Sequence, residues 1–154
     1  MSDTARDMIV RLQTALRADP RNADALYRLG VLYGQDGKFE EAQHLMGEAA
    51  KLRPASPDIP FARGYALQRL GRSEEAVRCF DAVLALKPDF PEALLNRAAA
   101  LFRLRRYAEA SADYARLLAL APDYPFARGN RLRSEEHTSE LQSHHDLVCR
   151  LLLE

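Results

Sequence analysis

The feature that most constrains the fold is a repeat of 34 residues, marked by evenly spaced prolines. Four sets of chemically similar residues keep this step along the chain. The sets are Pro20, Pro54, Pro88 and Pro122; Ala42, Ala76 and Ala110; Leu52, Leu86 and Leu120; and Leu12, Met46, Phe80 and Tyr114. A period this regular indicates one supersecondary unit that stacks on copies of itself.

Composition and charge narrow the class of protein. The 154 residues suffice for one domain, and 47% apolar with 29% charged residues is typical of a globular chain. No run approaches the roughly 18 apolar residues that a membrane span needs. Residues 1–7 carry charges where a signal peptide would be apolar, so we expect a cytoplasmic protein with no membrane partner. Basic and acidic residues number 22 each, so no net field favours nucleic acid.

The repeat divides the chain into units. An apolar stripe spaced by three and four residues predicts an amphipathic helix over residues 2–19. In the register of the repeat this helix is the second of a pair without its first, so we expect residues 1–19 to be a capping half-repeat. Three full units then occupy residues 23–56, 57–90 and 91–124.

The first full unit contains two predicted helices, Ala23–Gln35 and Phe39–Leu52, with the break Asp36-Gly37-Lys38 between them. Helices joined by such a short turn must lie antiparallel. Glycine inside a helix costs roughly 1 kcal/mol relative to alanine, so Gly30 indicates that the two backbones approach closely.

These residues resemble the signature of the tetratricopeptide repeat (TPR) family. In the first unit the motif reads Leu26-x2-Leu29-Gly30-x2-Tyr33, then Ala42-x3-Met46, then Pro54. The second unit keeps Gly64, Leu67, Gly71, Ala76, Phe80 and Pro88, and the third keeps Leu94, Leu101, Tyr107, Ala110, Tyr114 and Pro122. The resemblance implies an all-α fold, a right-handed superhelical solenoid of antiparallel helix pairs.

Several residues depart from this signature, among them Ala98, which replaces the helix glycine in the third unit. Pro60 stands where a large leading residue belongs, and because proline fits the first turn of a helix we expect that helix to begin late. Arg63 replaces a leucine. Arg105 stands at the position of the turn glycine, so we expect this turn to bend differently from the others.

A fourth unit begins at residues 125–132, but the sequence does not continue the repeat pattern beyond it. From Arg133 onward the period, the Ala/Leu/Arg-rich composition and the helix signature disappear. Residues 133–143 and then 147–153 match, in order, a short-read sequencing adapter translated in one frame. We therefore expect residues 133–154 to be a non-native tail.

Residues 88–93, 96–97 and 123–132 also resemble bacterial O-linked N-acetylglucosamine transferase-like proteins. In those proteins such a segment joins the TPR array to the glycosyltransferase domain. The resemblance implies an alternative function, in which this chain is the substrate-presenting region of a larger glycosyltransferase. No catalytic residue of that family lies in the chain.

The residues before the tail contain no recognisable catalytic motif, so we predict no enzyme activity, no metal site and no cofactor. The recurring pairs Glu40-Glu41 and Glu74-Glu75 stand at predicted helix starts, where carboxylates favour the positive end of the helix. Cys79 is expected to be a small buried residue, and His44 is alone on its helix.

Binding is the better-supported activity. The first helix of each unit in such an array lines a concave groove, whereas the second helix faces outward. Aromatic, arginine and asparagine side chains on the first helices are therefore candidates for binding a protein or peptide partner. The candidates are Tyr27, Arg28, Val31, Gln35, Phe61, Tyr65, Gln68, Arg69, Leu95, Asn96, Ala99, Arg103 and Asn130.

Two alternatives qualify this interpretation. Tyr27 or Phe61 can equally pack against the neighbouring helix without contacting a partner. Arginines in the groove also suit acidic peptides or chain-terminal carboxylates. The carboxylate clamp of chaperone-binding TPR proteins needs lysine and asparagine at fixed places, and only Asn96 is similar, so we do not transfer that function.

Overall fold

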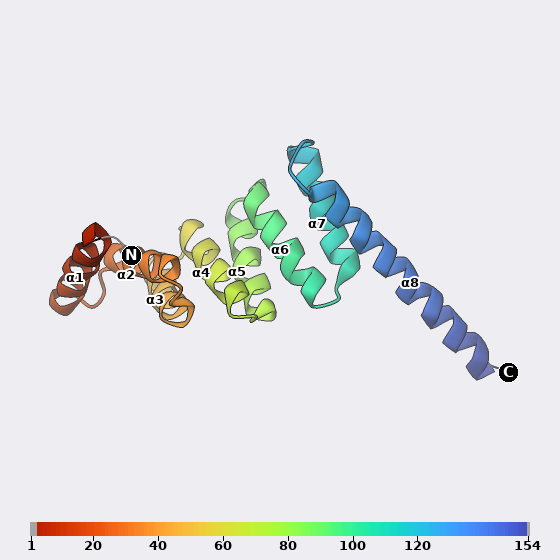
Figure 1. Ribbon diagram of the computed structural model, residues 1–154, viewed down its shortest axis with the longest axis horizontal. Coiled ribbons are helices and arrows are strands. Elements are labelled where there is room, and N and C mark those ends of the chain that lie inside the picture. The colour runs from red at the N-terminus through yellow and green to blue at the C-terminus, as the bar shows by residue number, and fades with distance from the viewer. Residues whose placement is uncertain (1–2, 154) are drawn as a thin grey trace. The chain divides into compact units, whose positions relative to one another are not determined.

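The computed structural model describes residues 3–153, with side chains described for residues 4–144. The described backbone forms eight α-helices and nothing else regular (Figure 1). They are α1 (Asp3–Ala18), α2 (Ala23–Gln35), α3 (Phe39–Leu52), α4 (Asp58–Arg69), α5 (Ser73–Leu86), α6 (Pro91–Arg103), α7 (Tyr107–Leu120) and α8 (Ala127–Leu153). No helix in the described part of the chain combines the length and apolar character needed to cross a membrane.

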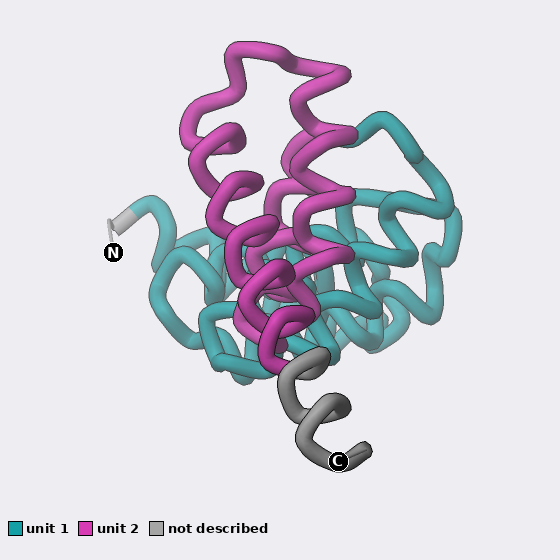
Figure 2. The backbone as a smooth tube through the Cα atoms, turned by 90° about the vertical axis from the view of Figure 1, so that its right-hand side faces the viewer, with its two compact units in different colours: residues 1–90 teal, residues 91–154 magenta. Residues whose placement is uncertain are grey.

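The chain divides into two compact units, residues 1–90 and residues 91–154 (Figure 2). The first contains α1 to α5 and the second contains α6 to α8. Within each unit, every helix packs against the next one along the chain. The predicted all-α fold of sequential helix pairs is confirmed, and the predicted bounds of α2 and α3 match the observed ones.

The turns inside the three helix pairs share one hydrogen-bonding pattern, although only two of them contain glycine. Gly37 and Gly71 follow α2 and α4 with φ of 80° and 76°, and Arg105 follows α6 with φ of 60°. After each helix, two successive backbone N–H groups donate to carbonyls in its last turn, as in a Schellman motif. The expectation that the Arg105 turn bends differently was wrong, because these two bonds impose the left-handed conformation on arginine as well.

Close packing of backbones explains the glycines inside the helices. A Cβ atom added at Gly30 would lie 3.0 Å from Met46 Cγ and 3.2 Å from the Ala42 carbonyl oxygen. One added at Gly64 would lie 2.8 Å from the ring of Phe80, which is fully buried. The predicted close approach at Gly30 is therefore confirmed.

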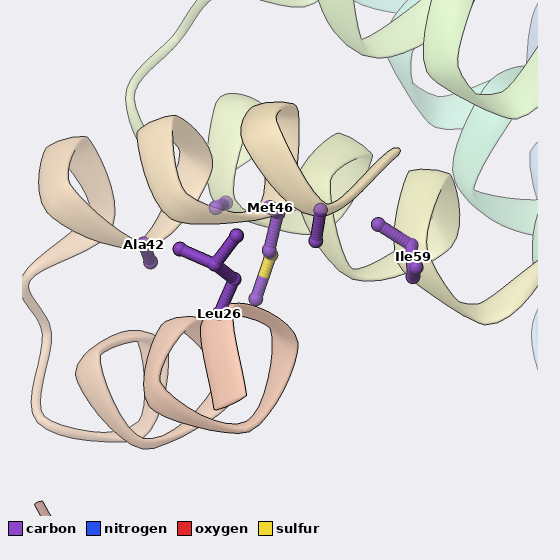
Figure 3. Close-up of a cluster of buried hydrophobic side chains, with 6 residues drawn as sticks. Leu26, Ala42, Met46 and Ile59 are labelled. Carbon is purple, nitrogen blue, oxygen red and sulfur yellow. The ribbon is translucent and has the colours of Figure 1, made fainter. Parts of the chain in front are cut away.

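The core of the first unit forms where α3 packs between α2 and α4. Figure 3 shows Leu26 of α2 and Met46 of α3 pointing toward each other, with Ala42 beside them and Ile59 contributed by α4. All four side chains are at least 93% buried. Burying such side chains contributes roughly 1.5–3 kcal/mol each for the larger ones, so this cluster holds the helices that position the site described below.

Several local predictions are confirmed. Helix α4 begins at Asp58, which leaves Pro60 in the first turn where its missing N–H has no helical partner to lose. Glu40 and Glu41 lie in the first turn of α3, and Glu74 and Glu75 lie in the first turn of α5. Cys79 is buried and has a free thiol.

Helix α8 extends past Arg133, where the helix signature of the repeat disappears from the sequence. It continues to Leu153, and no glycine or proline interrupts it after Arg133. Ser134 is fully buried and donates its hydroxyl to the Asn130 carbonyl at 2.8 Å, while Ser111 of α7 donates to Glu135 at 3.2 Å. Packing against α7 therefore supports a helix that the repeat pattern does not specify. The non-native origin of residues 133–154 remains a prediction.

Candidate functional site

The candidate site is a hollow of 560 Å³ in the first unit, which we call the α2–α4 groove. Side chains of α2 and α4 form its walls, and residues of α3 and of the turn before it complete the lining. The lining residues are Tyr27, Val31, Gly34, Gln35, Gly37, Phe39, Met46, Phe61, Ala62, Tyr65, Ala66 and Arg69.

Helical periodicity explains why these residues meet. Tyr27, Val31 and Gln35 follow one another at four-residue spacing on α2 and therefore share one face. Phe61, Tyr65 and Arg69 do the same on α4, each exactly one repeat further along the chain. Eight residues of helix advance about 12 Å, so the two rows border a groove that matches roughly four residues of extended peptide.

Arg69 is the only charged residue that lines the groove. Its guanidinium carbon lies 4.7 Å from the ring centroid of Phe39, and its Nη1 donates to the Tyr65 hydroxyl at 3.3 Å. A guanidinium over an aromatic face is stabilised by the ring quadrupole. The groove therefore combines apolar and aromatic walls with one cation that its neighbours hold in place.

The hydroxyl group of Tyr27 in the groove remains neutral. Burial, with a smaller contribution from the nearby Asp58 carboxylate, raises the pKa of Tyr27 above its ordinary value. Its phenol therefore keeps its proton at neutral pH and can both donate and accept a hydrogen bond. Tyr65 is 45% exposed and presents its ring to solvent.

Phe61 serves both of the purposes that the sequence left open. Its ring lies 5.9 Å from that of Phe80 in an edge-to-face arrangement and stacks at 5.1 Å on Phe90. It therefore packs in the first unit's core while its remaining surface lines the groove. Substituting Phe61 would disturb folding and binding together, so it is a poor probe of the site.

Two of the eight candidates in the first unit do not line the groove. Arg28 points away to pair with Asp24 at 2.8 Å, and this pair is exposed. Gln68 is half-buried beside Arg69 but outside the lining. The other six candidates are brought together around one hollow.

The candidates in the second unit are differently placed. The Asn96 side chain donates to the carbonyl of Glu92, one turn earlier on its own helix, at 2.7 Å. The Asn130 side chain hydrogen-bonds with Tyr114 of α7. Leu95 and Ala99 are half-buried on α6 and Arg103 is exposed at its end. Both amides that we predicted to bond a peptide backbone thus have partners within the protein.

Sequence reasoning missed half of the lining. Gly34, Ala62 and Ala66 are small residues on the predicted faces of α2 and α4, and helical spacing alone would have found them. Phe39 and Met46 belong to α3, which we expected to face outward. Because α3 lies beneath the two walls, its first and third turns reach the floor of the groove.

A second hollow of 580 Å³ lies against the opposite face of α2 and the start of α3. It is lined by Tyr33, His44 and the first-turn carboxylates Glu40 and Glu41, among others. Glu40 already accepts hydrogen bonds from Gln43 and Arg72. This acidic hollow lacks the aromatic walls of the α2–α4 groove. In the described part of the chain, no three histidine, cysteine, aspartate or glutamate side chains gather as a metal site.

Comparison with known families agrees with this architecture. Two family profiles, each described as tetratricopeptide repeat, match residues 12–44 and 61–125. Together these matches cover more than half of the chain. The protein is a tetratricopeptide-repeat protein. No curated protein sequence matches it.

Solved TPR structures are similar to this TPR protein. The first TPR of Spaghetti (RPAP3), bound to the HSP90 peptide SRMEEVD, is 28% identical with a TM-score of 0.72, and the match covers 79% of this chain and 96% of that one. The first TPR domain of human RPAP3 is 27% identical with a TM-score of 0.71, covering 80% and 98%. A MamA crystal structure, 18% identical with a TM-score of 0.77, covers 96% and 87% and supports the fold alone.

Proposed function

We propose that this TPR protein is a non-catalytic scaffold that binds an extended peptide segment of a protein partner in the α2–α4 groove. The observation that carries the proposal is the groove itself, where six predicted residues from two successive repeats surround one hollow of 560 Å³. Concave sites with mostly apolar walls and a few polar groups are the usual form of ligand sites.

Two further observations support a peptide as the ligand. The similar TPR of Spaghetti is described with a bound HSP90 peptide. The hollow is bordered by parallel rows of side chains about as long as four extended residues, which suits a strand-like segment better than a compact molecule. The cytoplasmic location predicted from the sequence is compatible with such a role.

The alternative function is the presentation of substrate to a glycosyltransferase domain outside this chain. It rests on the sequence resemblance at residues 88–93, 96–97 and 123–132, and no comparison reported above adds to it. Peptide binding in the groove would also be needed for that role, so the experiment below bears on both.

A groove-filling substitution tests the proposal. Gly34 lines the groove, and a Cβ added there would meet only Ala42 Cβ, at 3.9 Å. Gly34→Leu should therefore fill the hollow without forcing the helices apart. We expect peptides selected by the full chain from a random-peptide display library to bind Gly34→Leu at least about tenfold more weakly by fluorescence polarisation.

Gly34→Ala is the matched control, because it adds only the Cβ atom and should bind the same peptides nearly as well as the natural protein. Thermal unfolding followed by circular dichroism checks that both variants are folded. Unchanged affinity in folded Gly34→Leu would show that the peptides bind elsewhere, and the proposal would then be wrong.

A further inference from the structure

We infer that the α2–α4 groove selects peptide segments in which a large apolar residue stands next to an aspartate or glutamate, with Arg69 binding the side-chain carboxylate. This inference rests on the proposed function and names the chemistry of its ligand. It depends on the charge and the surroundings of Arg69, which we consider in turn.

Charge complementarity favours an anionic group at Arg69. None of the twelve lining residues is acidic, and within the described part of the chain no carboxylate lies within ion-pair distance of Arg69. Its hydrogen bond to Tyr65 uses one of five guanidinium N–H groups. The remaining donors can form the paired hydrogen bonds that a carboxylate accepts from arginine.

The negative end of α4 does not oppose such an anion strongly. Carbonyls at the end of a helix attract cations and repel anions when they lack partners. Here the backbone N–H groups of Gly71 and Arg72 donate to Gln68 and Leu67 at 3.0 and 2.9 Å, and that of Leu70 donates to Ala66 at 3.1 Å. Because these carbonyls are bonded, the full charge of Arg69 dominates the field at this end of the groove.

The neighbouring surface requires an apolar side chain beside the carboxylate. Phe39 and Tyr65 contact Arg69 directly, and Val31, Met46, Ala62 and Ala66 continue the lining behind them. A large apolar side chain would replace water in this hollow, at a gain of about 25 cal/mol for each Å² of apolar surface buried. The groove thus pairs an apolar subsite with an adjoining cationic one.

A carboxylate inside the peptide fits this arrangement better than one at a chain terminus. Gln35 holds the same place on α2 that Arg69 holds on α4, and these two are the strongest hydrogen-bond donors at this end of the groove. The Gln35 amide offers a further N–H donor for a carboxylate in the groove. The lining contains neither the lysine nor the asparagine that a carboxylate clamp for a chain terminus needs.

The test uses the full chain and the display-selected peptides, synthesised with acetylated and amidated ends so that only side-chain carboxylates are present. We expect the selected sequences to be enriched in aspartate or glutamate next to a large apolar residue. Arg69→Gln should weaken their binding by roughly tenfold and reduce its salt dependence, because an exposed charge pair is screened by salt.

Two controls separate charge recognition from altered folding. Arg17→Gln changes another arginine in the last turn of a helix of the same unit, outside the groove, and should leave affinity unchanged. Replacing the acidic residue of the peptide by its amide should weaken binding to the natural protein but not to Arg69→Gln, which a double-mutant cycle measures directly.

The outcomes distinguish this inference from the proposed function. If selected peptides bind in the groove but carry no acidic preference, or if Arg69→Gln keeps that preference, the inference is wrong and the proposed function stands. If only peptides with a free carboxyl terminus bind, Arg69 binds a terminal carboxylate instead of a side-chain one, and the inference is wrong. If Gly34→Leu has no effect on any selected peptide, both the inference and the proposed function fail.

Discussion

Two helix pairs one repeat apart, α4–α5 in the first unit and α6–α7 in the second, accommodate an arginine between their helices in different ways. Both first helices carry an arginine at the position of the signature leucine, Arg63 and Arg97. In the second pair, Arg97 forms two hydrogen bonds of 2.7 and 2.6 Å with Asp113, whose side chain is 5% exposed. In the first pair the residue in phase with Asp113 is Cys79, and the buried Nε of Arg63 has no hydrogen-bond partner.

The apolar contacts of the two pairs compensate for this difference. At α4–α5 the small residue is Gly64, and the ring of Phe80 packs directly against its backbone. At α6–α7 the in-phase residues are Ala98 and Tyr114, both buried. The comparison teaches that one repeat geometry accommodates either a glycine–aromatic contact or a buried ion pair. It also predicts which substitutions each pair tolerates.

Removing the carboxylate of the ion pair should have the largest effect. Asp113→Ala removes the carboxylate that binds Arg97, whose side chain is 19% exposed and therefore largely buried. Breaking a buried pair in this way costs about 3 kcal/mol. Chemical denaturation of the full chain measures the change.

The in-phase change Cys79→Ala is the matched control, since it removes a small side chain that pairs with no charge, and we expect it to cost only about 1 kcal/mol. Equal decreases in the free energy of unfolding of the two variants would mean that the Arg97–Asp113 pair adds nothing to stability beyond packing.

A methyl group at Gly64 should have the next largest effect. Its Cβ would lie 2.8 Å from the buried ring of Phe80 and 3.1 Å from Cys79 Cβ, so the α4–α5 pair must shift. Overpacking costs about 1–3 kcal/mol, and alanine's better helix propensity returns roughly 1 kcal/mol of this, so Gly64→Ala should destabilise the protein by up to about 2 kcal/mol.

Gly34→Ala, on the neighbouring first helix, provides the contrast for Gly64→Ala. It meets no close neighbour and should stabilise the protein by up to about 1 kcal/mol. Thermal unfolding compares the two variants, and a shift of the same sign in both would contradict the role of the Gly64–Phe80 contact.

Substitution in the turn of the α6–α7 pair should have the smallest effect on stability, and it should stabilise the protein instead of destabilising it. Arg105 holds the left-handed conformation that Gly71 holds one repeat earlier. That conformation costs an L-residue about 1–2 kcal/mol in the folded state. Glycine avoids this cost, but its unfolded chain has more conformational freedom to lose on folding, which offsets part of the gain. Arg105→Gly should therefore raise stability by about 0.5–1 kcal/mol, measured by denaturation.

The reverse test uses Gly71→Ala, which should lower stability by a similar amount although nothing lies within 4 Å of the added Cβ atom. If Gly71→Ala were neutral, backbone conformation would not be what distinguishes these two turns.

The candidate site was predictable in part, and the reason is periodicity. Four-residue spacing on the first helices brought six residues of the first unit to one groove, from Tyr27 on α2 to Arg69 on α4. The same reasoning was less informative for Asn96 and Asn130, because an amide on the expected face can bond its own helix or the next one instead. The choice between such partners depends on distances of a few ångströms that residue spacing does not contain.

The sequence by itself determined the repeat, the helix pairs, the bounds of α2 and α3 and the close approach at Gly30, because these follow from local propensity and from a 34-residue period. The left-handed Arg105 turn was not foreseen from the sequence, and it follows from the two backbone hydrogen bonds that close the end of α6. Tertiary structure alone decided the contribution of Phe39 and Met46 to the groove and the continuation of α8 past Arg133. Both depend on contacts between elements, where packing against a neighbour overrides what the local residues prefer.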